Sequence, residues 1–117
     1  MGSKKVLPEY TLLSAVAVSG TNTYTQAKPT NIQNLDNIGI QVFWTGSMVG
    51  VISVKCSVDG VNFNALTFNP VLAQPSGTAG GYIIDLNQVP FPWLQVSYTN
   101  TSSTGNLTAL IFAKDVN

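Results

Sequence analysis

The residues that decide the fold are Val54–Phe63, VKCSVDGVNF, in which a strand pattern runs into an Asp-Gly pair. Apolar residues recur at every second position up to Val58, as in a strand with one buried face. Asp59-Gly60 predicts a tight turn, because hairpin turns need positive φ angles and glycine adopts them without steric cost. The stretch therefore predicts a β-hairpin whose first strand faces the core with Ile52, Val54, Cys56 and Val58.

Similar patterns extend outward from this hairpin in both directions. Turn-forming residues separate the expected strands, at 10–18, 30–35, 38–45, 51–58, 62–68, 82–86, 93–99 and 106–114, and 21–25 is a polar, β-prone stretch. Loops are expected at 46–50 and 69–81. The pattern predicts an all-β fold, an antiparallel β-sandwich or jelly roll of seven to eight short strands, as a single domain over residues 10–117.

Two expected strands are apolar on both faces. In 106–114, Leu107, Ala109, Ile111 and Ala113 share one face, but Leu110 and Phe112 lie on the other. Phe43 likewise lies opposite the face that carries Trp44, which we expect in the core. A strand with one face in water should alternate cleanly. Either a loop or arm of this chain covers the second face, or another subunit does.

Residues 1–9 show no periodicity and contain Pro8, so we expect an extended N-terminal arm. One interpretation is a frayed terminus. The other is an arm that orders against a neighbouring subunit, with Val6, Leu7 and Pro8 as its apolar contacts.

The charge content of the 117 residues is low. Charged residues make up 9% of the chain, with five lysines, no arginine, no histidine and zero net charge, against roughly 25% charged residues in an ordinary domain. Such a surface is poorly protected against association, which favours a homo-oligomer. Nucleic-acid binding is not expected, because neutralising phosphates needs clustered lysine or arginine side chains.

No catalytic, cofactor or metal site is expected, and we predict a non-enzymatic protein. A zinc or iron site is excluded in practice, since there is no histidine and Cys56 is the only cysteine. Cys56 is interpreted as a small buried hydrophobic residue. Asp59 is explained by its turn, and the nearby asparagines lack the carboxylate density that calcium needs.

Phe91-Pro92-Trp93 is the aromatic group most open to a binding role, because two prolines hold the pair at the entrance of a strand. A rigid plug at the sheet edge is the simpler interpretation, and glycan stacking is the other. No apolar run approaches the roughly 18 residues of a transmembrane helix, and no secretory signal is found, so no membrane association is expected.

The motifs Ser57–Phe63, Tyr82–Leu86, Pro92–Thr99 and Gly105–Thr108 occur in an order that resembles small β-sandwich virion structural proteins of tailed bacteriophages. The resemblance covers about residues 38–114. It implies a head decoration (cement) protein or a tail or spike component, located in the virion and assembled in the bacterial host cytoplasm. The implied partners are other copies of this chain and a phage capsid or tail protein.

The leading hypothesis is therefore a capsid decoration protein that oligomerises and binds the virion surface. One alternative is a carbohydrate-binding or receptor-binding module of a tail or spike, acting through Phe91 and Trp93; another is an inhibitor of a host protein. The sequence leaves open the virion surface, the oligomer symmetry, the strand order and arm swapping. The candidate partner-binding residues are Val6, Leu7, Pro8, Phe91, Trp93 and Phe112.

Overall fold

The computed structural model describes residues 6–33, 35, 37–68, 74–87, 91–101 and 103–114, with side chains for all of these except residues 6–10 and Asn87. Within this part of the chain there is no helix, and all strand pairs are antiparallel. The predicted all-β antiparallel class is confirmed. The eight strands are β1 (Val6–Val18), β2 (Asn22–Thr25), β3 (Thr30–Asn31), β4 (Asn37–Ser57), β5 (Asn64–Ala65), β6 (Ser76–Asn87), β7 (Trp93–Asn100) and β8 (Gly105–Lys114).

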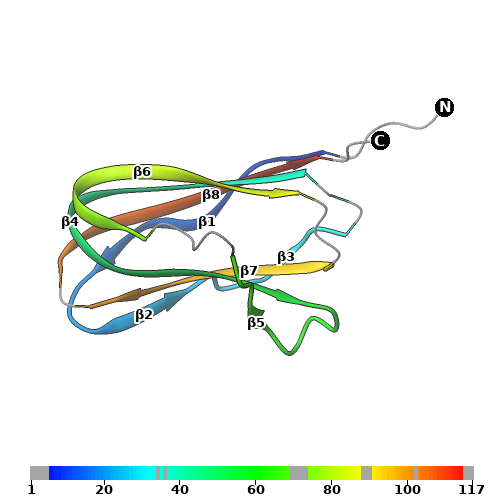
Figure 1. Ribbon diagram of the computed structural model, residues 1–117, viewed down its shortest axis with the longest axis horizontal. Helices are drawn as coiled ribbons and strands as arrows, with labels where there is room; N and C mark the ends of the chain where they lie inside the picture. Colours follow the sequence, from blue (N-terminus) through cyan, green and yellow to red (C-terminus); the bar gives the residue numbers. More distant parts are fainter. Residues whose placement is uncertain are drawn as a thin grey trace.

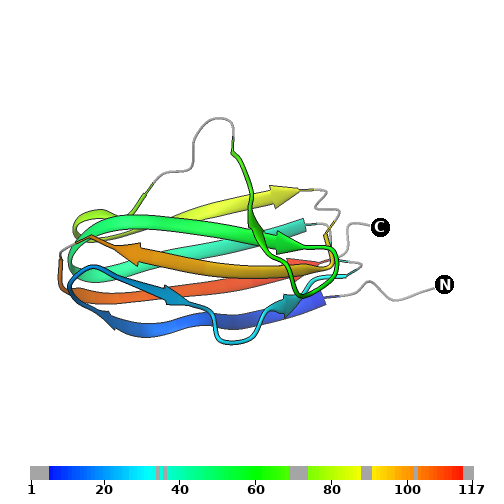
Figure 2. The same cartoon turned by 90° about the horizontal axis from the view of Figure 1, so that it is seen from below.

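The strands form two packed layers, so the fold is a β-sandwich (Figures 1 and 2). The first layer has the order β1-β8-β4-β6 and uses the first half of β4. The second layer places β2 and β3 beside β7, followed by the second half of β4 and then β5. We call the end where β1 begins and β8 stops the terminal end. The opposite end, where β1 leads to β2 and β7 leads to β8, is the crossover end.

β4 passes from one layer to the other without a loop. We expected two strands separated by a loop at 46–50, but the strand is continuous over Asn37–Ser57. Gly46 has a φ of 82°, and a Cβ atom there would lie 2.8 Å from the Cα of Gly105. Pairing with β6 shifts between Trp44 and Ser47 and then resumes. The bend therefore depends on a glycine that accepts a positive φ and a close backbone neighbour.

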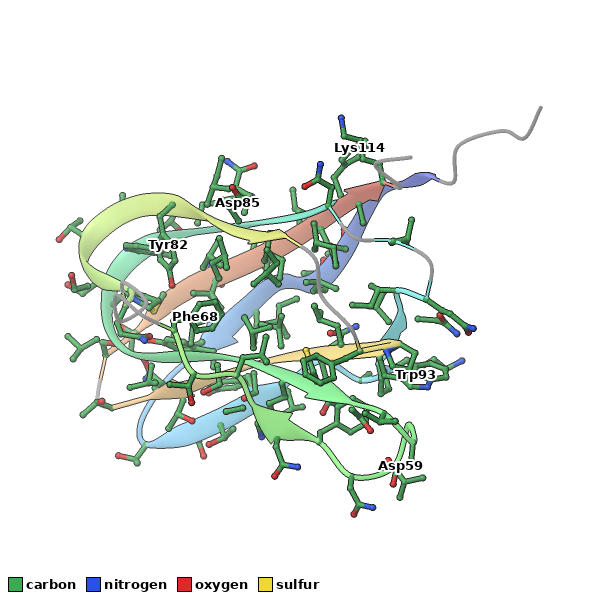
Figure 3. The ribbon with its side chains drawn as sticks, turned by 45° about the vertical axis from the view of Figure 1, so that its right-hand side comes forward. Asp59, Phe68, Tyr82, Asp85, Trp93 and Lys114 are labelled. Atoms are coloured by element: carbon green, nitrogen blue, oxygen red, sulfur yellow. The ribbon has the colours of Figure 1, made fainter. Side chains whose placement is uncertain are left out.

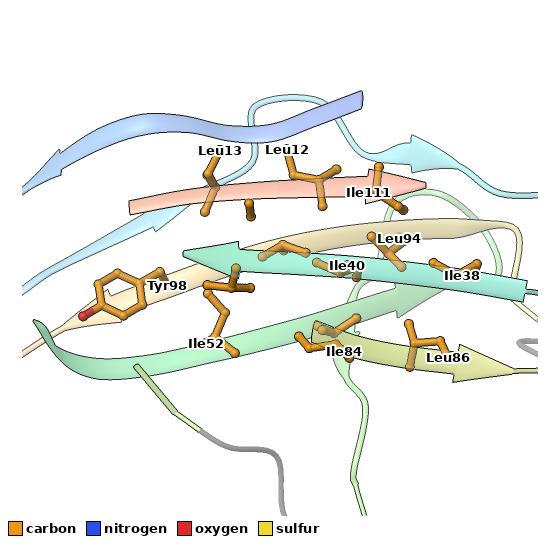
Figure 4. Close-up of a cluster of buried hydrophobic side chains, with 14 of the residues drawn as sticks. Leu12, Leu13, Ile38, Ile40, Ile52, Ile84, Leu86, Leu94, Tyr98 and Ile111 are labelled. Carbon is orange, nitrogen blue, oxygen red and sulfur yellow. The ribbon is translucent and has the colours of Figure 1, made fainter. Parts of the chain in front are cut away.

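The inward side chains of the two layers make one apolar core (Figure 4). The predicted alternation is confirmed in β4 and in β8, where the inward side chains are buried. Burial of one such side chain contributes roughly 1.5–3 kcal/mol. The buried residues in these strands and in β7 include Ile38, Ile40, Val42, Trp44, Ile52, Val54, Cys56, Leu94, Val96, Tyr98, Leu107, Ala109, Ile111 and Ala113.

A buried polar cluster joins the segments that meet at the crossover end. The Asn100 side chain is 0% exposed. Its Nδ2 donates to the carbonyls of Gly20 (2.8 Å) and Ser103 (2.7 Å). Its Oδ1 accepts from the Tyr98 hydroxyl (3.1 Å) and from Ser103 Oγ (2.9 Å). The amide thus uses its full bonding capacity, as a buried polar side chain must. Ser103 Oγ also accepts from Val49 N in β4 (2.9 Å).

The first strand begins earlier than expected. β1 starts at Val6 and not at Tyr10, with Val6 opposite Lys114 and Leu7 opposite Ala113. Residues 6–9, which we assigned to an arm, therefore belong to β1, and Val6 and Leu7 pair with β8 of the same chain. Residues 1–5 of the expected arm lie outside the described residues.

Other boundaries also differ from the pattern. Val58 is 73% exposed, so its assignment to the core face is wrong: β4 ends at Ser57 and the turn begins there. The expected strand at 62–68 is reduced to Asn64–Ala65, and the one at 30–35 to Thr30–Asn31. β6 begins at Ser76, inside the stretch expected to be a loop, of which residues 69–73 lie outside the described part.

Candidate interaction surface

The Asp59 carboxylate organises the turn that follows β4. Its Oδ1 accepts from Ser57 Oγ (2.8 Å) and from the backbone N–H groups of Val61 and Asn62 (both 2.9 Å). Its Oδ2 accepts from Asn62 Nδ2 (2.8 Å). These hydrogen bonds, above all the one from the Asn62 backbone, lower the pKa of Asp59 well below its usual range. Gly60 has a φ of 79°, as predicted.

Both carboxylate oxygens of Asp59 are therefore engaged in hydrogen bonds within the turn. The turn is longer than a two-residue hairpin, since β5 begins at Asn64. Within the described residues, no three His, Cys, Asp or Glu side chains come together as metal ligands would. Cys56 is buried, as expected, and burial raises the pKa of its thiol to about 11. A thiol with that pKa stays protonated near neutral pH and is a poor nucleophile.

Trp93 and Phe91 both lie close to this turn, but they contact different parts of it. A Cβ atom on Gly60 would lie 3.0 Å from the Trp93 indole nitrogen, so the indole covers the glycine. Figure 3 shows Trp93 and Asp59 at the same end of the sandwich. Phe91 instead lines a depression of about 510 Å³. The other residues of this depression include Asp59, Asn62 and Asn64.

The largest departure from an ordinary sandwich is the outer face of the first layer. Four apolar side chains point outward there, and we call this group the apolar face: Phe43, Ile83, Leu110 and Phe112. Ile83 is 70% exposed, Phe112 48% and Phe43 37%. Strand register places Ile83 and Leu110 on either side of Gln41, and Phe112 beside Gly39. Since Gly39 has no side chain, a depression of about 400 Å³ lies among these residues.

Two opposite charges border the apolar face. Asp85 in β6 lies opposite Gly39 of β4, and Phe112 in β8 lies opposite the same glycine from the other side. Lys114 lies on the β8 side, one outward-facing position farther along. In Figure 3 both side chains point away from the sandwich on the outer side of the first layer. Neither makes an ion pair with any residue that the structure describes, and both are exposed.

The candidate partner-binding residues fall into two places. Phe112 lies on the apolar face, whereas Phe91 and Trp93 lie at the terminal end, where β1 also starts with Val6 (Figure 1). The side chains of Val6, Leu7 and Pro8 are not described. Sequence reasoning missed Ile83, although the alternation that puts Ile84 in the core already points Ile83 outward. It also missed that Asp85 and Lys114 border this face on opposite sides.

Comparisons with known proteins agree on the fold. No protein-family model matches this chain, and no curated protein matches it in sequence. Among solved structures, the SPBc2 prophage-derived protein YomS is similar, with a TM-score of 0.53 and 10% identity over 98% of this chain and 97% of YomS. A chain in the structure of infectious bursal disease virus, Gx strain, has a TM-score of 0.56 and 16% identity over 97% of this chain.

The two similarities differ in extent. This chain spans nearly all of YomS but about a third of the infectious bursal disease virus chain, 32%. At these identities the similarity concerns the fold, which a prophage-derived protein and a viral protein share with this chain. In addition, no helix in the described residues is long and apolar enough to cross a membrane.

Proposed function

We propose that this chain is a non-enzymatic structural protein of a bacteriophage virion, a capsid decoration protein that oligomerises and binds the virion surface. The observation that carries the proposal is the apolar face, with Ile83 70% and Phe112 48% exposed on a chain that has only 9% charged residues. A soluble monomer gains nothing from such a face, whereas an assembly buries it. The fold shared with a prophage-derived protein and a viral protein supports the same conclusion.

The terminal end is the part that we propose to contact the virion. Val6, Leu7 and Pro8 start β1 there, and Phe91 and Trp93 lie at the entrance of β7. β8 occupies one edge of β1, so at Val6 and Leu7, which precede the first register shift, the other edge is the one that can take a short strand of the capsid or tail protein. This arrangement leaves Phe112 and the apolar face for contacts between copies.

Binding to particles tests the proposal directly. Purified chain is added to virions of the encoding phage that lack this gene, the particles are sedimented, and bound protein is counted by mass spectrometry. We expect stoichiometric binding, reduced at least tenfold in Trp93→Ala, and unchanged in Thr23→Ala, a control on the second layer. Failure to bind, together with absence from wild-type virions, contradicts the proposal.

A carbohydrate-binding or receptor-binding module is the second candidate. The observation in its favour is the depression in which Phe91 lies with Asn62 and Asn64, since an aromatic ring beside amide groups suits a sugar. Trp93 does not line this depression. A glycan array therefore decides between the two: binding that is lost in Phe91→Ala and kept in Trp93→Ala favours this candidate.

A further inference from the structure

We infer that a second copy of this chain covers the apolar face, related to the first by a two-fold axis that runs along β4. The inference rests on the proposed function only in assuming that the chain oligomerises. It adds which face is used, what covers it and how the two copies are oriented. A two-fold interface is formed by the same surface on both copies, so each contact occurs twice.

Strand order fixes what such an axis brings together. β6 and β8 flank the first half of β4 on opposite sides. Rotation about an axis along β4 therefore places β6 of one copy over β8 of the other. The rotation keeps each residue's position along the strand direction. Ile83 of one copy therefore lies over Leu110 of the other, and Asp85 of one copy lies over Phe112 of the other. The two sheets then pack with aligned strands, which is the common arrangement for face-to-face sheets, about 10 Å apart.

The charges support this orientation. In each copy Asp85 lies on the β6 side and Lys114 on the β8 side, one outward position beyond Phe112. Across the two-fold axis, Asp85 of one copy comes next to Lys114 of the other, within reach of its four-carbon stem. The same pair forms again on the symmetric side. An axis perpendicular to the strands would instead separate the two charges, since it reverses positions along β4.

The edge of the first layer is less suited to the same role. β1 is an edge strand, and its pairing with β8 shifts register three times, between Leu7 and Tyr10, Thr11 and Leu13, and Leu13 and Val16. Ala15 in the last of these shifts has a φ of 44°. Bulges of this kind interrupt the regular row of backbone groups that a second edge would need. The outer face, in contrast, is regular over Asn37–Trp44.

Charge reversal tests the inference in solution with the full chain. Sedimentation equilibrium of the wild type should show the 12.4 kDa chain passing to twice that mass as concentration rises. We expect Asp85→Lys and Lys114→Asp each to weaken dimerisation about tenfold or more, because each places like charges opposite one another. The double variant restores opposite charges at both sites and should return to within about threefold of the wild type.

Lys28→Asp is the matched control, since Lys28 is also exposed but lies between β2 and β3 in the second layer. It should dimerise as the wild type does, and thermal melting should confirm that all variants fold. A wild type that stays monomeric at every concentration overturns the inference. So does a dimer that neither single reversal weakens, or a double variant no better than the singles.

The outcome also separates this inference from the proposed function. A chain that binds virions but shows no charge-dependent dimer overturns the two-fold contact and leaves the virion role standing. A charge-dependent dimer that is absent from virions and does not bind them supports the contact and contradicts the virion role.

Discussion

The two outer faces of the sandwich differ in chemistry although the same strand, β4, contributes to both. On the first layer the outward side chains include the four large apolar ones of the apolar face, Phe43, Ile83, Leu110 and Phe112, beside polar ones such as Gln41 and Thr108. On the second layer they are mostly polar, apart from Val51 at one end and Trp93 at the other: Ser53, Lys55, Gln95, Thr99, Thr23 and Thr25. Thr23 and Thr99 even share a hydrogen bond across the strands, at 3.1 Å.

The difference shows that an apolar outer face is not forced by the composition of the chain. Serine and threonine are available for a solvated face, and the second layer uses them in the usual pattern of apolar inside and polar outside. The first layer departs from this pattern in three adjacent strands at once. A contact surface accounts for such a concentrated departure, whereas chance would scatter exposed apolar side chains.

Adjacent isoleucines in β6 give the strongest test of this comparison. Ile84 is 2% exposed and Ile83 is 70% exposed. Ile84→Ala should lower the free energy of unfolding by about 3 kcal/mol, because it leaves a cavity in the core. Ile83→Ala should lower it by less than about 1 kcal/mol. Urea denaturation at a concentration where the wild type is monomeric measures both, and equal losses would mean that Ile83 serves the fold.

Asn100 should be second in effect, since its cluster holds the two layers together at the crossover end. Asn100→Ala leaves the Tyr98 hydroxyl and the carbonyls of Gly20 and Ser103 without this partner. We expect a loss of about 2–3 kcal/mol from these unpaired groups. Thr23→Ala removes an exposed hydrogen bond from the second layer and should cost less than about 1 kcal/mol. Similar losses in both variants would contradict the role given to the cluster.

Much of the difference between inward and outward side chains could be predicted from the sequence, because alternation along a strand depends only on neighbouring residues. Trp44 in the core and Phe43 and Phe112 outside it were predicted from alternation alone, as was the glycine turn at Gly60. The layer to which each half of β4 belongs was not predicted. That depends on Gly46 accepting a positive φ against Gly105, a contact between residues far apart in the chain.

The ends of strands were harder to predict, because they also depend on contacts that the alternation pattern does not show. Val58 continues the alternation, but the Ser57 hydroxyl donates a hydrogen bond to the Asp59 carboxylate, so the turn already begins at Ser57 and includes Val58. Similarly, β6 begins within a Gly- and Thr-rich stretch whose own propensity is weak, because pairing with β4 extends to Ser76. The candidate face was predicted in part: Phe112 was identified, but the roles of Asp85 and Lys114 appear only once β6 and β8 are known to flank β4.

Making the second outer face apolar should reverse the difference between the layers. In the variant Ser53→Leu, Thr99→Leu, new apolar side chains join the exposed Val51 on neighbouring strands. We expect the free energy of unfolding to change by less than about 1 kcal/mol, while sedimentation shows association beyond the wild-type species. If the mass distribution stays as in the wild type, apolar exposure alone does not drive contact, and the first face must owe its contact to shape and charge.

The smallest expected effect lies in the turn, away from both faces. The hydrogen bonds to Asp59 lower its pKa in the folded chain, so the carboxylate binds a proton less readily there than in the unfolded chain, where its pKa is about 3.9. The resulting stabilisation is complete above that unfolded value and is lost as pH falls through the folded value. Since Asp59 is fully exposed, the effect should be modest. Thermal melting from pH 6 downwards should show a shallower acid decline in Asp59→Asn than in the wild type. Equal slopes in the two proteins would contradict this role of the turn.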